Sequence, residues 1–62
     1  MSRYIILIYV RPARSESFYY DPSTITVTAR DDVSALKVAI ADALERGYEG
    51  ERAQIIRREL LQ

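Results

Sequence analysis

Seven consecutive apolar or aromatic residues decide the fold of this chain: Tyr4-Ile5-Ile6-Leu7-Ile8-Tyr9-Val10. Most of them are β-branched or aromatic, and the sequence predicts a strand from about residue 3 to residue 10. Side chains alternate between the two faces of a strand, so Ile5, Leu7 and Tyr9 share the face opposite the even-numbered residues. Both faces are apolar, and both need cover.

The chain is too short to cover both faces with its own helices, and it has no covalent staple. Its 62 residues form a single predicted domain, residues 1–62, and a domain of this size buries only about 60% of its unfolded surface. The absence of cysteine excludes disulfides. Oligomerisation remains as a source of stability, so we expect a homodimer. A central strand inside a tightly packed monomer is the alternative.

Charge and hydropathy restrict the cellular compartment and the partners that we expect for the protein. No segment reaches the roughly 18 apolar residues that span a bilayer, and no small-residue cleavage site follows residues 4–10. We therefore expect a soluble cytoplasmic protein with no membrane partner. Nine basic and nine acidic residues give a net charge of zero, which provides no general attraction to nucleic acid.

A second strand is predicted over residues 24–29, after a turn at Asp21-Pro22-Ser23. Residues 16–20 are predicted to form either a short strand or an aromatic loop. The strand over residues 24–29 alternates cleanly, and its threonines, Thr24, Thr26 and Thr28, share one face.

Two helices are predicted to follow. The first is capped by Asp31 or Asp32 and runs to about Arg46, and Gly47 is the residue that can take a positive φ after it. Its predicted apolar face consists of Val33, Leu36, Ala39, Ile40, Ala43 and Leu44. The second is predicted over residues 50–61, with a core stripe of Ala53, Ile56 and Leu60.

The predicted fold class is therefore α+β: a small antiparallel sheet of two or three strands followed by two helices, in the order ββ(β)αα. Ile55 flanks the core stripe of the second predicted helix, whose apolar arc is wider than its own core requires. The predicted self-association residues are Ile5, Leu7, Tyr9 and Ile55. The sequence leaves open which face of the first strand the helices cover.

No residue pattern indicates catalysis. The four serines, Ser15, Ser17, Ser23 and Ser34, have no histidine to activate them. The adjacent Asp31 and Asp32 match helix-capping groups, and Gly47 and Gly50 do not form a phosphate loop. The sequence therefore predicts a protein that is not an enzyme, with no catalytic residue, no metal site and no cofactor.

Part of the chain resembles a DNA-binding family. The alternating segment Thr24-Ile25-Thr26-Val27-Thr28, followed by Arg46-Gly47-Tyr48 and the segment from Arg52 to Leu60, is similar to the ribbon-helix-helix fold of bacterial and phage repressors and antitoxins. The resemblance implies that two chains pair their strands into a ribbon that enters the major groove. It also implies that Thr24, Thr26 and Thr28 face the bases, and that backbone N–H groups near Arg52 bind phosphate.

Taken together, the sequence favours a small non-enzymatic protein-interaction module that self-associates as a homodimer through its sheet. Its size and plain composition match a regulatory or phage-type accessory protein, or a designed one. A further protein partner is not identified by any motif. The alternative is a dimeric, ribbon-helix-helix-like transcriptional repressor or antitoxin, and nucleic acid is a partner only under that alternative.

Overall fold

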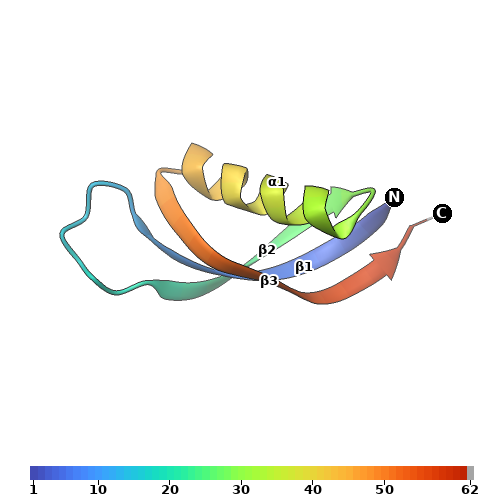
Figure 1. The fold of residues 1–62 in the computed structure, drawn as a ribbon, viewed down its shortest axis with the longest axis horizontal. Coiled ribbons are helices and arrows are strands. Elements are labelled where there is room, and N and C mark those ends of the chain that lie inside the picture. Colours follow the sequence, from blue (N-terminus) through green and yellow to red (C-terminus); the bar gives the residue numbers. More distant parts are fainter. Residues whose placement is uncertain (62) are drawn as a thin grey trace.

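The computed structural model describes residues 1–61, which form a three-stranded antiparallel sheet with one helix packed on one face (Figure 1). The elements are β1 (Ser2–Pro12), β2 (Asp21–Ala29), α1 (Asp32–Glu45) and β3 (Tyr48–Leu60). β1 is the central strand, and both neighbours run antiparallel to it. β2 and β3 therefore run in the same direction on either side of β1, and α1 connects them.

The predicted helix over residues 50–61 is wrong, because residues 50–60 belong to β3. The order of elements is thus ββαβ and not ββ(β)αα, although the α+β class is confirmed. A sheet of β1 and β2 alone would leave one edge of β1 without hydrogen-bond partners for its backbone groups, and β3 supplies them.

Two irregularities explain why the residues of β3 match a helical period. The register between β1 and β3 shifts opposite Ile5/Ile6 and again opposite Leu7/Tyr9. Each shift places an extra residue in β3, as a β-bulge does, and moves the following side chains by one position. The alternation that identifies a strand is therefore interrupted twice.

The boundaries of the hairpin also differ from the prediction. β2 begins at Asp21, so the predicted turn at residues 21–23 is the start of the strand. Pro22 is tolerated there because β2 is an edge strand. Residues 16–20 form no strand and belong to the loop between β1 and β2.

The core lies between α1 and the even-numbered face of β1. Tyr4, Ile6 and Ile8 are 1%, 0% and 0% exposed, and they are the largest fully buried side chains. The side of α1 that meets them is a stripe of small residues, Ala35, Ala39 and Ala43, spaced four apart. Such spacing keeps one face of a helix in line, and alanine lets that face approach the sheet closely. The question that the sequence left open is thus answered: the helix covers Tyr4, Ile6 and Ile8.

Gly50 allows β3 to approach the same core. A Cβ atom at this position would lie 2.7 Å from Cδ1 of Ile8 and 3.6 Å from Cβ of Ala43. The backbone of β3 therefore passes directly over the buried Ile8 side chain. Gly47 has a φ of 86° just after the C-cap residue Arg46, which confirms the predicted helix end. Within residues 1–61 no helix has the length and apolar character needed to cross a membrane.

Asp31 caps α1, and its carboxylate gives the fold a pH dependence. Oδ1 of Asp31 accepts a hydrogen bond of 2.7 Å from the backbone N–H of Ser34. This bond to the charged form lowers the pKa of the Asp31 carboxyl below its ordinary value of 3.8. A carboxyl with a depressed folded-state pKa contributes stability that is present above its unfolded pKa and is lost as pH falls through the folded value.

We therefore expect Asp31→Asn to flatten the acid side of the stability profile. Asparagine retains an accepting oxygen for the cap but does not titrate. At neutral pH the helix should persist, and the loss of stability as the pH falls below about 4 should be smaller than in the wild type. Urea midpoints measured by circular dichroism across this range test the expectation. If the variant lost as much stability at low pH as the wild type, the titration of Asp31 would not be the cause of that loss.

Candidate functional site

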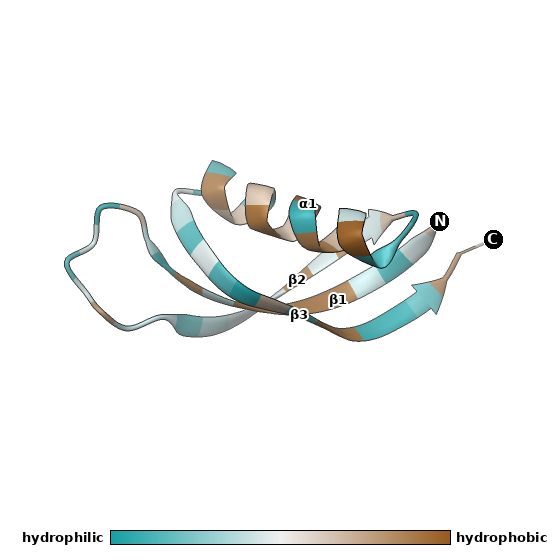
Figure 2. Cartoon of the chain, in the orientation of Figure 1, coloured by the Kyte–Doolittle hydropathy of each residue, from teal (hydrophilic) through white to brown (hydrophobic). Residues whose placement is uncertain are grey.

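The face of the sheet opposite α1 is left uncovered by the residues that the structure describes (Figure 1). Ile5, Leu7 and Tyr9 point to this side and are half-buried. Tyr4, Ile6 and Ile8, on the other face of β1, are fully buried. Figure 2 shows the hydrophobic stretch of β1 running through the centre of the sheet. An apolar row therefore lies at the middle of an exposed surface.

Strand pairing determines what surrounds this row. Residues directly opposite each other in an antiparallel pair share a face of the sheet. The register therefore places the threonines of β2 on one side of the apolar row, and polar residues of β3 on the other side. We call this surface the open face, and it consists of Thr24, Thr26 and Thr28 of β2, Ile5, Leu7 and Tyr9 of β1, and Glu51, Gln54 and Arg57 of β3. The apolar row is thus flanked by threonines on one side and by polar and charged side chains on the other.

Arg52 folds over one end of the apolar row. Its guanidinium carbon lies 4.3 Å from the centre of the Tyr9 ring, within the range of a cation–π contact. Arg52 has a φ of 52° and lies where the register between β1 and β3 shifts. A bulge of this kind redirects a side chain, and here it aims Arg52 at Tyr9.

Arg11 fastens the loop between β1 and β2 to the same end of the sheet. Its Nε and Nη2 lie 2.9 and 2.8 Å from Oε2 of Glu49, and Nη1 donates to the backbone oxygen of Ser17 at 2.9 Å. The Glu49 carboxylate raises the pKa of Arg11. The guanidinium also lies 4.8 Å from the centre of the Tyr20 ring. The loop is held at its base, while its tip exposes Phe18 and Tyr19.

The other end of the open face carries a second set of paired charges. Glu59 lies 3.6 Å from Arg3 and 3.0 Å from Arg57. Each end of the surface therefore holds arginine and glutamate together. The surface has no large region of one charge sign that would repel a similar surface.

The predicted site residues divide into two groups. Ile5, Leu7 and Tyr9 are brought together on the open face. Ile55 is not, because it pairs with Ile6 on the helix side of the sheet and packs against the core. Ile55 was predicted as a self-association residue because it was expected to flank the core stripe of a second helix. These residues form a strand, so that argument no longer applies.

The residues that the DNA-binding resemblance singled out also separate. Thr24, Thr26 and Thr28 are exposed on the open face, beside the apolar row. Arg52 lies inside β3 and contacts Tyr9, and no helix begins near it. The backbone N–H groups at a helix start, which the resemblance assigned to phosphate, are therefore not present at this position.

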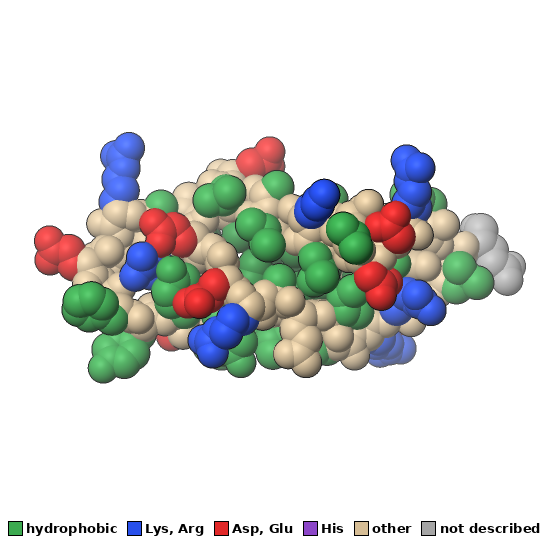
Figure 3. All heavy atoms as spheres, viewed as in Figure 1, with side chains coloured by type: hydrophobic (Ala, Val, Ile, Leu, Met, Phe, Trp, Pro, Cys, Tyr) green, Lys and Arg blue, Asp and Glu red, His purple; other side chains and the backbone are tan. Residues whose placement is uncertain are grey.

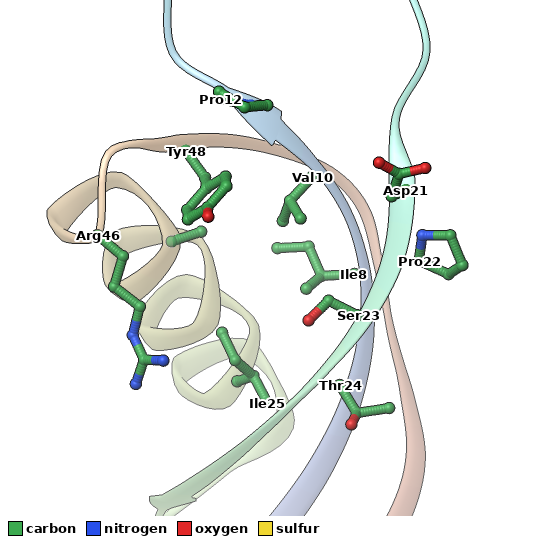
Figure 4. A pocket seen from close by; sticks show the side chains of 11 residues that line it. Ile8, Val10, Pro12, Asp21, Pro22, Ser23, Thr24, Ile25, Arg46 and Tyr48 are labelled. Carbon is green, nitrogen blue, oxygen red and sulfur yellow. The ribbon is translucent and has the colours of Figure 1, made fainter.

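Two further features were not predicted from the sequence. A pocket of about 550 Å³ lies on the helix side, between the end of α1 and the far half of the β1–β2 hairpin (Figure 4). Ile8, Val10 and Ile25 point into it, and the Arg46 guanidinium at its margin lies 3.1 Å from Oδ2 of Asp42. The pocket depends on how far α1 extends over the sheet, which no local pattern encodes.

The second feature is an exposed apolar ridge along α1. Figure 3 shows hydrophobic side chains gathered along the seam between α1 and β3. Val33 and Leu44, which were predicted to lie in the core, are 63% and 59% exposed, and Ile56 of β3 is 51% exposed. The alanine stripe faces the sheet, and Val33 and Leu44 are therefore turned to the flank of the helix.

Within residues 1–61 no group of three or more potential ligand side chains is placed to hold a metal ion. Comparisons with protein-family models, curated proteins and solved structures found no match to the chain. The open face, with its apolar row, is a candidate contact surface.

Proposed function

We propose that this chain is a small, non-enzymatic protein-interaction module that associates with a second copy of itself through the open face. The observation that carries the proposal is the position of Ile5, Leu7 and Tyr9. They form the apolar row on the one side of the sheet that no element of residues 1–61 covers.

Burial of the apolar row on association would contribute a favourable free energy to this small domain. Fully burying a large aliphatic or aromatic side chain contributes about 1.5–3 kcal/mol. Among residues 1–61, only Tyr4, Ile6 and Ile8 are large side chains that are fully buried. Ile5, Leu7 and Tyr9 are already half-buried, so covering them would contribute part of this amount for each residue and add a second apolar layer to a small core.

The charge pattern favours a second copy as the occupant. Two sheets pack face to face about 10 Å apart, with their strands crossing at about −30°. If two copies stack with Leu7 on the two-fold axis and their β1 strands antiparallel, Ile5 lies over Tyr9 of the second copy. In the same arrangement Arg57 lies over Glu51 of the second copy, so that opposite charges meet at the border of the apolar contact.

The DNA-binding alternative lacks the element on which it depends. A ribbon-helix-helix repressor would use the start of its second helix to bind phosphate, and residues 50–60 of this chain belong to the strand β3. The chain also carries no net positive charge to drive phosphate binding. We therefore propose self-association and not DNA binding as the function of the open face.

Self-association predicts a melting temperature that depends on protein concentration. Because the associated state is folded, mass action stabilises it as concentration rises. Thermal unfolding followed by circular dichroism at about 2 µM and about 200 µM should give a higher midpoint at the higher concentration. Superimposable melting curves, together with the mass of a single chain at both concentrations, would contradict the proposal.

A further inference from the structure

The two edges of the sheet differ in how they are protected against a further strand. β3 is irregular along its length, because its register with β1 shifts twice and Arg52 has a positive φ. It also carries several charged side chains, including Arg57 and Glu59. Bulges, charged residues and prolines are among the devices by which proteins block a sheet edge.

β2 carries such residues only at its start, where Asp21 and Pro22 lie. Its pairing with β1 runs without a shift from Asp21 to Ala29. No charged residue occurs between Pro22 and Ala29, and the centre of the strand is the β-branched run from Thr24 to Thr28. A regular, uncharged, β-branched strand at the edge of a sheet presents unpaired N–H and C=O groups to any suitable strand.

The sequence of β2 is complementary to itself when two copies run antiparallel. With Thr26 opposite Thr26 of the second copy, Thr24 faces Thr28 and Ile25 faces Val27. Threonine then meets threonine on the open face, and apolar residues meet on the helix side, as cross-strand pairing favours. This register keeps both helices on the same side of the joined sheet.

We infer that the edge of β2 is a second contact surface, which pairs with β2 of another copy around Thr26 to form one continuous sheet with three strands from each copy. This contact goes beyond the association proposed for the open face, because it uses backbone groups at the sheet edge and not the side chains of Ile5, Leu7 and Tyr9. Stacking of two open faces leaves the edge of β2 accessible, so both contacts can exist in one assembly.

Disulfide trapping tests the edge contact directly, since the chain has no cysteine of its own. In the inferred register the two Thr26 positions are opposite each other, at a separation that a disulfide bridges. Thr26→Cys should therefore form covalent dimer under mild oxidation about ten-fold faster than a collisional control, because pairing raises the effective concentration of the two thiols. Ser23→Cys is the matched control, since the two Ser23 positions would lie roughly 20 Å apart along the joined strands.

A third variant separates the edge contact from the open-face contact. Leu7→Cys should cross-link when open faces stack, because Leu7 lies on the two-fold axis of that arrangement. Cross-linking of Leu7→Cys without cross-linking of Thr26→Cys above the Ser23→Cys control would overturn the edge contact and leave the open-face proposal standing. The reverse pattern would support the edge contact and contradict the open-face proposal.

Amide hydrogen exchange on the unmodified chain gives an independent measurement. An edge strand protects only alternate amides, whereas a strand paired on both sides protects consecutive ones. Consecutive protection from Thr24 to Thr28 is the result expected for the edge contact. Alternating protection at a concentration where the chain is associated would overturn it.

Discussion

Replacing Ile6 by alanine is expected to lower the free energy of unfolding by about 2–5 kcal/mol. Ile6 has no exposed surface, pairs with Ile25 and Ile55, and lies under α1. Removing most of its side chain creates a cavity that the rigid strand cannot close. Urea unfolding followed by circular dichroism measures the loss.

The neighbouring residue Ile5 provides the matched control. It has the same chemistry but points to the open face, where it is half-buried. Measured at a concentration low enough for single chains to predominate, Ile5→Ala should cost clearly less than Ile6→Ala. Equal losses for the two variants at that concentration would mean that both faces of β1 are covered within one chain, and would contradict the account.

Replacing Leu7 by aspartate is expected to weaken open-face association about 100-fold or more. Leu7 lies at the centre of the apolar row, and association would bury the new carboxylate beside its symmetry mate. Burying unpaired like charges costs several kcal/mol, and about 3 kcal/mol already corresponds to roughly 100-fold in affinity. Sedimentation velocity measures the change.

The fold of a single chain should survive this substitution, because Leu7 lies on the face of the sheet opposite α1. Far-ultraviolet circular dichroism of Leu7→Asp should therefore match that of the wild type. Val38→Asp is the matched control: Val38 is also exposed, but it lies on α1, away from the open face. It should leave association unchanged. A loss of association in both variants would point to the helix side and not to the open face.

The sequence contains enough information for three of the four elements. β1 is recognisable from its continuous apolar run, β2 from its alternation, and α1 from Asp31 and Gly47 at its ends. β3 was missed because two register shifts break its alternation, which left apolar spacings that suit a helix as well. The prediction also omitted a hydrogen-bonding partner for the second edge of β1.

Part of the candidate site follows from the sequence in the same way. Alternation alone groups Ile5, Leu7 and Tyr9, because it does not depend on the rest of the fold. The choice of which face the helix covers depends on tertiary packing, here on the alanine stripe that begins at Ala35. Ile55 was grouped with the wrong surface because its direction depends on whether its segment is a helix or a strand.

Sedimentation equilibrium of the wild type and Leu7→Asp at micromolar concentration tests the central claim most directly. The account predicts a wild-type mass at least twice the 7.2 kDa of one chain, and a mass about two-fold lower for Leu7→Asp with its helix signal retained. A wild-type mass of one chain across the micromolar range, or an associated Leu7→Asp variant of unchanged mass, would contradict it.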